Sequence, residues 1–289
     1  MFEKVQFTCA DGYVLQGRFF PKQHAPKQQD STHLPILIGS ATGIKQGFYQ
    51  AFAKWLTEQG YDVMTFDFRG IGDSLYEPVS KSKAFIHQWG NLDLVSAIDF
   101  LTDKTNSAQI HLIGHSAGGQ LLGLAPNHAK VKNVVAIAGS SGSLKGLNGK
   151  SKYLAPIMLK VVFTVSTLFK GYASAKAVGM GENLPKGVGQ EWCEYCSKGG
   201  YAINAIGKTV FDDFHSAIKT PITAVHATDD EIATLHNVKD LLKTYPNSTT
   251  KIVTLAPKAY GLRSIGHMEM FKPSHQQLWT VIADQLNAA

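Results

Sequence analysis

The feature that most constrains this chain is an apolar run, residues 109–113, that leads straight into the sequence Gly-His-Ser-Ala-Gly at residues 114–118. The run is rich in Ile and Leu and too short for a helix, so it predicts a buried strand. The residues that follow Gly119 can form a helix. A Gly-x-Ser-x-Gly sequence in this context is typical of a sharp turn that strains the serine backbone and lifts its hydroxyl above the sheet. We therefore expect Ser116 at the apex of a strand, turn and helix.

The glycines around this serine are expected to be steric requirements. A bulky side chain at Gly114, Gly118 or Gly119 would collide with the flanking strand and helix. The alternative interpretation is a glycine-rich helix N-terminus in which Ser116 is an ordinary N-cap.

Composition and charge limit the class of protein. The 289 residues suffice for one large α/β domain or two smaller ones, and 44% hydrophobic and 17% charged residues are typical of a soluble globular protein. The start of the chain lacks the regions of a secretory signal, so we expect a cytoplasmic protein. Three cysteines fit a reducing compartment, and the lone Cys193-x-x-Cys196 pair is interpreted as structural thiols rather than a metal or redox site.

The net charge of +6 favours anionic substrates or surfaces in general terms. The lysines are spread along the chain, and no nucleic-acid-binding motif accompanies them. We therefore expect a basic solvated surface and no nucleic-acid partner.

Strand-like and helix-like stretches alternate along most of the chain. This alternation predicts a mostly parallel sheet covered by helices on both faces, after an N-terminal hairpin and a surface loop at residues 21–33. Ligands of such sheets bind at the carboxyl ends of the strands, where Ser116 lies. Strands are expected at residues 34–39, 61–68, 109–113, 134–138, 221–226 and 251–255, and helices at about 48–60, 91–101, 237–245 and 274–286.

The alternation breaks between residues 139 and 215, which predicts an insertion in a single α/β domain. An apolar run at residues 153–172 approaches membrane-spanning length, but Pro156, Lys160 and Lys170 interrupt it. We expect two helices that lie over the sheet edge and no stable membrane insertion.

A serine nucleophile needs a base within hydrogen-bond reach, and the base needs a third group to orient it. Of eleven histidines, His267 follows the last strand and precedes the last helix, so it lies at the same sheet edge as Ser116. We interpret His267 as the general base. A loop histidine that caps a helix is the alternative.

The orienting acid is expected after the strand that ends near His226. Asp229 and Asp230 are adjacent there, and one of them need only be an N-cap. A metal site formed by His226 with Asp229 or Asp230 is conceivable but lacks further ligands at metal spacing.

The order Ser, Asp, His along the chain is similar to that of the α/β-hydrolase fold. Nearly the whole chain resembles this superfamily, in particular the uncharacterised bacterial "predicted α/β hydrolase" proteins with a helical cap. The residues that carry the resemblance are the serine turn, the Asp-x-Arg-Gly-x-Gly-x-Ser sequence at residues 67–74, the aspartate loop and Gly266-His267. The resemblance implies Ser116 as nucleophile, His267 as base and Asp230 as acid, with Asp229 as runner-up.

One departure from the family concerns the oxyanion hole. The family often has His-Gly after its oxyanion strand, where this chain has Ser40-Ala41 before Thr42. The contact is a backbone N–H, so the hole need not be lost, and Thr42 and Ala117 are the two candidate donors.

The expected reaction is acyl transfer from an ester or thioester to water, with a hydrophobic acyl group and neither cofactor nor metal. The expected partner is a small-molecule acyl substrate. The sequence does not decide the oligomeric state, for which a homodimer is one alternative. The fold also hosts peptidases, lyases and acyltransferases. Two further interpretations stay open, a non-catalytic binding protein and a peripheral membrane protein that docks through residues 153–172.

Overall fold

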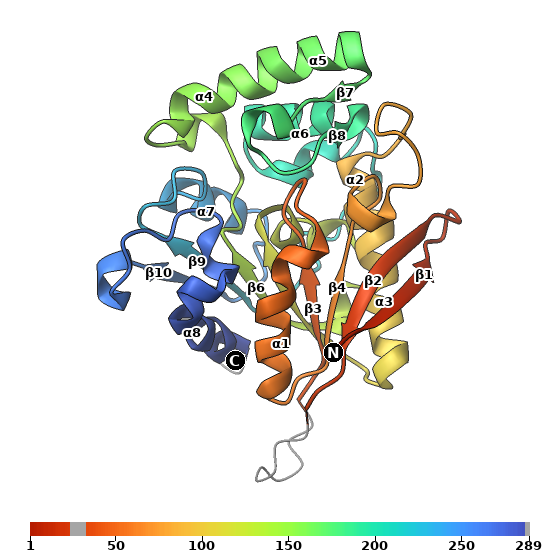
Figure 1. The fold of residues 1–289 in the computed structure, drawn as a ribbon, viewed down its shortest axis with the longest axis vertical. Helices are drawn as coiled ribbons and strands as arrows, with labels where there is room; N and C mark the ends of the chain where they lie inside the picture. Colours follow the sequence, from red (N-terminus) through yellow and green to blue (C-terminus); the bar gives the residue numbers. More distant parts are fainter. Residues whose placement is uncertain (24–32, 287–289) are drawn as a thin grey trace.

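The computed structural model, which describes residues 1–23 and 33–286, is built around an eight-stranded sheet in the order β1-β2-β4-β3-β5-β6-β9-β10 (Figure 1). β2 is antiparallel to both β1 and β4, and the other neighbouring strands are parallel. The predicted parallel sheet and N-terminal hairpin are thus confirmed. The strands are β1 Glu3–Thr8, β2 Val14–Phe20, β3 Ile36–Gly39, β4 Val63–Phe66, β5 Ile110–His115, β6 Val131–Ile137, β9 Ile222–Ala227 and β10 Thr250–Leu255.

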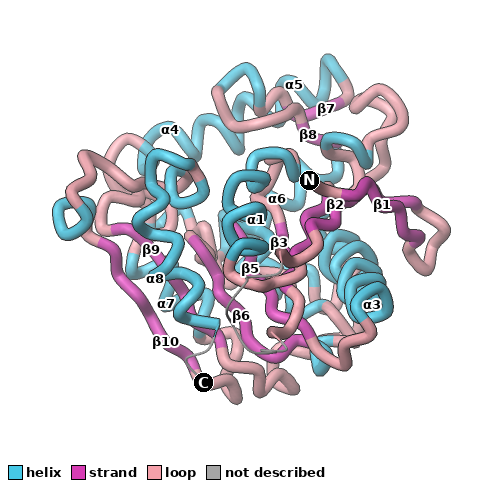
Figure 2. The backbone as a smooth tube through the Cα atoms, turned by 60° about the horizontal axis from the view of Figure 1, so that its bottom comes forward, coloured by secondary structure: helices cyan, strands magenta, loops and turns pink. Residues whose placement is uncertain are grey.

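The central strands are buried along their whole length. Every residue of β3, β4, β5 and β9 is buried. Helices lie on both faces of the sheet (Figure 2), and strands covered on both faces are continuously apolar rather than alternating. This explains why the short Ile- and Leu-rich runs of the sequence form strands.

The helices between the strands bury one apolar side each. The helix α1 directs Phe52 and Leu56 into the core, and the Phe52 ring lies 5.5 Å from the Trp279 ring of α8. On the other side, the Phe100 ring of α3 stacks on Phe7 of β1 at 5.1 Å. These helices are α1 Gln50–Glu58, α2 Ile86–Gln88, α3 Leu94–Thr105, α7 Leu235–Leu242 and α8 Trp279–Ala283.

Two expected helices differ in the structure. After Ser116 there are two short 3₁₀ turns, Ser116–Gly119 and Leu122–Leu124, instead of a regular helix. A Cβ atom at Gly123 would lie 2.2 Å from the His215 ring, so close packing holds the chain here. The closing helix is also divided, with 3₁₀ turns on both sides of α8. The predicted loop at residues 21–33 lies largely outside the described residues.

The segment between β6 and β9 lies above the carboxyl ends of the strands, at the top of Figure 1. A wide turn at Met158–Val162 joins two of its helices, α4 and α5, so that helical backbone runs from Ser151 to Lys170. A third helix, α6, packs beneath α5, and the Phe163 ring lies 5.8 Å from Trp192. The elements are α4 Ser151–Ile157, α5 Phe163–Lys170, β7 Tyr172–Ala173, β8 Leu184–Pro185 and α6 Lys186–Lys198.

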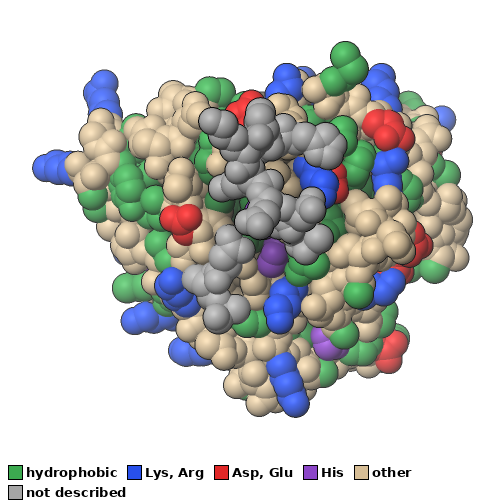
Figure 3. Space-filling model, turned by 90° about the horizontal axis from the view of Figure 1, so that it is seen from below, with side chains coloured by type: hydrophobic (Ala, Val, Ile, Leu, Met, Phe, Trp, Pro, Cys, Tyr) green, Lys and Arg blue, Asp and Glu red, His purple; other side chains and the backbone are tan. Residues whose placement is uncertain are grey.

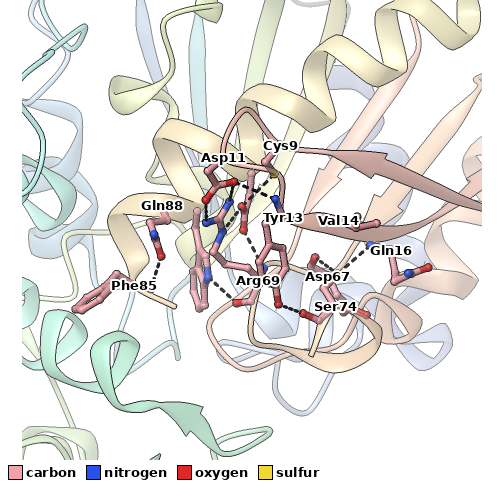
Figure 4. Close-up of polar contacts among 12 residues, drawn as sticks. Cys9, Asp11, Tyr13, Val14, Gln16, Asp67, Arg69, Ser74, Phe85 and Gln88 are labelled. Carbon is pink, nitrogen blue, oxygen red and sulfur yellow. Dashed lines mark hydrogen bonds and ion pairs between the residues drawn. The ribbon is translucent and has the colours of Figure 1, made fainter. Parts of the chain in front are cut away.

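A buried ion-pair network holds the turn after β4 (Figure 4). The Arg69 guanidinium donates to Asp93 and to Asp11 at 2.6 Å each, and Trp89 Nε1 donates to the Arg69 carbonyl at 3.1 Å. Burial raises the pKa of Asp93 to about 6, although the charge of Arg69 opposes that rise. The network joins β4 to the N-terminal hairpin and to the start of α3.

Candidate active site

Ser116 has a backbone φ of 48°, in the left-handed region that residues other than glycine rarely adopt. It directly follows β5, so its side chain stands at the carboxyl edge of the sheet. The strained turn expected from the sequence is therefore present, and an ordinary N-cap, whose backbone is extended, does not describe it.

The glycines of the turn have no room for a side chain. A Cβ atom at Gly118 would lie 2.3 Å from the backbone of Gly39, at the end of β3. A Cβ atom at Gly114 would lie 2.3 Å from the backbone of Gly119. The predicted steric requirement is confirmed, since real Cβ contacts are not this short.

His267 contacts Asp230 and not Asp229. Its Nδ1 lies 2.9 Å from Asp230 Oδ2, and the buried Asp230 also accepts hydrogen bonds from the backbone N–H groups of Ile232 and Ala233. Asp229 is exposed and accepts hydrogen bonds from the backbone of Ile265 and Gly266 instead. The two adjacent carboxylates therefore hold the ring of His267 and the loop that precedes it, respectively.

The electrostatics favour an ionised Asp230. Burial alone raises the pKa of this carboxyl, but the charge of His267 and the hydrogen bonds from His267 and two backbone N–H groups outweigh it, so the pKa lies below its ordinary value. An ionised carboxylate at Nδ1 keeps the proton on that nitrogen and leaves Nε2 free to accept one.

His115, the residue before the serine, lies in a buried hydrogen-bonded chain. Tyr49 Oη lies 2.9 Å from His115 Nδ1, and His115 Nε2 lies 2.9 Å from the carbonyl oxygen of His267. Burial lowers the pKa of His115 to about 3, with a smaller contribution from His267. The ring is thus neutral at pH 7, and because a carbonyl only accepts, Nε2 donates to it and Tyr49 donates to Nδ1.

Tyr49 also accepts a hydrogen bond from a backbone N–H group near the serine. The Ala41 N–H donates to Tyr49 Oη at 2.8 Å. The N–H groups of Thr42 and Ala117 donate to no acceptor in the part of the chain that the structure describes. Both N–H groups are therefore available for an anion.

A cavity of about 490 Å³ joins these residues. Thr42, Ser116 and His267 lie in its wall, and most of the remaining wall is apolar. The segment between β6 and β9 supplies much of it, including Leu154, Met158, Leu159, Val162 and Trp192. Ligand sites of small molecules have this size and this character.

The structure brings together Ser116, His267, Asp230 and Thr42, with Ala117 buried beside the serine. The sequence did not single out Tyr49 as part of the site. Its position one turn before Phe52 indicated burial, but no local pattern could show that its hydroxyl reaches Ala41 and His115.

Cys193 and Cys196 are free thiols on α6, and burial raises the pKa of Cys196 to about 12. Within residues 1–23 and 33–286, no group of three or more His, Cys, Asp or Glu side chains is arranged to hold a metal ion. His226 instead lies 3.0 Å from Thr254.

A family model described as alpha/beta hydrolase fold matches residues 36–186 of this chain. The uncharacterized protein YfhR of Escherichia coli strain K12 is 32% identical over 120 residues, which are 40% of this chain and 39% of YfhR. Human gastric triacylglycerol lipase is 29% identical over 187 residues, 58% of this chain and 44% of the lipase. The chain thus spans less than half the length of each of these relatives.

Among solved structures, a soluble variant of the monoglyceride lipase of Saccharomyces cerevisiae, in complex with a substrate analog, is similar to this chain. The similarity covers 99% of this chain and 96% of the lipase, with 14% sequence identity and a TM-score of 0.67. At this identity the similarity shows a shared fold.

Proposed function

This chain belongs to the α/β-hydrolase fold family, and from that premise we propose that it is a serine hydrolase that cleaves carboxylic esters or thioesters. The observation that carries the proposal is the strained Ser116 in the wall of a cavity that His267, paired with Asp230, also lines. Neither a cofactor nor a metal takes part in the proposed reaction.

In the proposed first step, Ser116 Oγ attacks the acyl carbonyl while His267 Nε2 takes the hydroxyl proton. Asp230 stabilises the resulting imidazolium through Nδ1. His267 then gives the proton to the departing alcohol or thiol, which leaves an acyl group on Ser116. Water, activated by the same histidine, releases the acid and restores the serine.

The negative oxygen of the tetrahedral intermediate needs two donors, and we assign them to the N–H groups of Thr42 and Ala117. The support is that both are free of other acceptors, whereas the Ala41 N–H is engaged by Tyr49. Loss of one such donor lowers rates by about 10²- to 10³-fold in enzymes of this kind.

We propose a hydrophobic acyl group because the wall above Ser116 is apolar and is supplied largely by residues 139–215. That segment acts as a cap in this proposal. A cap of aliphatic and aromatic side chains excludes water from an acyl chain and offers few polar partners to a peptide.

The proposal is tested by intact-mass labelling with a fluorophosphonate. We expect one adduct on the wild-type chain and on His236→Ala, which changes an exposed histidine. We expect none on Ser116→Ala and strongly slowed labelling of His267→Ala. A folded wild-type chain that takes no adduct, or an adduct that persists in Ser116→Ala, contradicts the proposal.

The acyl group is tested with p-nitrophenyl esters from acetyl to dodecanoyl. A rate that rises with chain length and then falls as the cavity fills supports the hydrophobic substrate. Activity confined to the acetyl ester contradicts it while leaving the serine chemistry intact.

A further inference from the structure

The helical stretch from Ser151 to Lys170 has one apolar side that is buried and a second apolar face that is exposed. On the inner face, Leu159 and Phe163 are buried. The outer face carries Leu154, Ile157, Val161, Val165 and Leu168 at helical spacing, each at least half exposed. Less than a quarter of the stretch is buried, although its length and composition are those of a membrane-crossing helix.

The exposed apolar side chains of this outer face are grouped on one helix rather than scattered singly over the surface. Leu168 and Phe169 are 77% and 79% exposed, and Tyr153 adds an exposed ring at the other end. Contiguous apolar surface of this kind marks an interaction site. The helices α4 and α5, which carry this face, lie along the top of the molecule, away from the sheet (Figure 1).

The charge of the segment that contains the helix is of one sign, although Glu231, from outside the segment, accepts a hydrogen bond from the Ser151 N–H at the start of the helix. Residues 139–181 contain six lysines and no Asp or Glu. The rest of the chain has 22 basic and 22 acidic residues, so the entire formal excess of +6 lies in this segment, contrary to the expected even spread. At the opposite end of the molecule, basic and acidic side chains are interspersed (Figure 3).

The lysines of the helix are available to a partner. Lys152, Lys160 and Lys170 are exposed and pair with no carboxylate in the described part of the chain. An exposed apolar face on a helix that also carries unpaired lysines is complementary to an anionic lipid surface, which offers both acyl chains and phosphates.

We propose that the helix Ser151–Lys170 docks this protein on anionic phospholipid surfaces, lying in the interface rather than crossing the bilayer. A spanning position would place Lys160 near the bilayer centre, which is costly, and would remove Leu159 and Phe163 from their packing. Leu154 and Ile157 are exposed and also line the cavity. In the docked protein, this part of the cavity wall would therefore lie against the lipid.

Vesicle co-sedimentation tests the proposal with the full chain carrying Ser116→Ala, so that binding is read without turnover. We expect binding to vesicles of equal parts phosphatidylcholine and phosphatidylglycerol, weakening as salt rises, and much weaker binding to phosphatidylcholine alone. The triple variant Lys152/Lys160/Lys170→Gln should lose about 100-fold in affinity for the anionic vesicles, at about fivefold per lysine.

The double variant Leu168→Glu, Phe169→Glu should lose binding to both vesicles. The matched controls are Phe211→Glu, which changes a ring that is 81% exposed outside the helix, and Lys239/Lys243/Lys258→Gln, which removes three exposed lysines elsewhere. Both controls should bind like the parent chain, and circular dichroism should show all variants folded.

Three results would overturn the proposal. The first is absence of binding to the anionic vesicles, including the case in which the face instead forms a dimer that the double variant Leu168→Glu, Phe169→Glu dissociates. The second is equal losses in the helix variants and the controls. The third is resistance to alkaline extraction, which would indicate a membrane span. None of these outcomes depends on the proposed hydrolase activity, because the readout is binding.

Discussion

The imidazole of His115 is hydrogen-bonded to the backbone of His267, with Nε2 2.9 Å from the carbonyl oxygen. The residue before the serine therefore holds the loop that carries the proposed base. With Tyr49 at its other nitrogen, His115 connects that loop to Ala41 beside the proposed oxyanion hole.

Tyr49→Phe is predicted to destabilise the fold. The change removes one hydroxyl and leaves the Ala41 N–H and His115 Nδ1 buried without their partner. Leaving such groups unsatisfied costs about 1–3 kcal/mol each, so the free energy of unfolding in urea should fall by about that amount or more. Tyr153→Phe, which removes an exposed hydroxyl, should have no effect, and equal stability of both variants would contradict the assigned chain of hydrogen bonds.

Asp230→Asn and Asp229→Asn are predicted to differ strongly in activity. Asp230 contacts the His267 ring, and its loss should reduce kcat by about 10⁴-fold because the ring then adopts the wrong tautomer. Asp229 contacts backbone only, so Asp229→Asn should lower ester hydrolysis far less. Hydrolysis rates of the two purified variants decide this, and a larger loss in Asp229→Asn would reverse the assignment.

Stability is predicted to fall in acid partly through His115. Its pKa is about 3 in the folded chain and about 6.5 when unfolded, so protons bind preferentially to the unfolded chain between these values. This contribution is fully present above pH 6.5 and is lost as the pH falls toward 3, with a size on the order of 5 kcal/mol.

The measurement is the free energy of unfolding against pH for the wild-type chain and for His115→Gln, which cannot titrate. Burial also lowers the pKa of His111, to about 4, so the difference between the two curves is the readout. The wild-type curve should be the steeper one between pH 6.5 and 3. Parallel curves would show that His115 does not resist protonation.

Substitution of the cavity wall is predicted to change the acyl chain that is accepted. Val162 lines the cavity, whereas its neighbour Val161 is 53% exposed. Val162→Phe fills part of the cavity and should lower the rate for long-chain esters at least about tenfold relative to acetyl esters, since one or more methylene groups lose their place. Val161→Phe should leave the ratio unchanged, and an unchanged ratio in Val162→Phe would argue against this cavity as the acyl site.

Much of the fold follows from local pattern. Continuous apolar runs such as residues 110–113 predicted buried strands, and their alternation with amphipathic stretches predicted the parallel sheet, because both depend on which side chains must leave water. The prediction of a regular helix after Ser116 was wrong. Close packing of Gly123 on His215 decides the backbone there, and that contact joins residues far apart in the sequence.

The candidate site was predictable where strand order alone decides position. Ser116 and His267 both follow strands whose carboxyl ends share one edge of the sheet. The sequence could not separate Asp229 from Asp230 without the family resemblance, because a single step along a turn reverses where a side chain points. The geometry favours Asp230, which accepts hydrogen bonds from two backbone N–H groups of its own turn and also contacts the His267 ring.

The contact of Gly118 with the backbone of Gly39 has a consequence for how such a chain can vary. Main chain touches main chain there, so the turn of Ser116 and the end of β3 form one rigid block with no side chain between them to exchange. Side-chain substitutions elsewhere should therefore leave the spacing between Ser116 and Thr42 unchanged. The side chains that line the cavity from the segment between β6 and β9 can change one by one without moving that block, so they are where differences in the accepted substrate can arise.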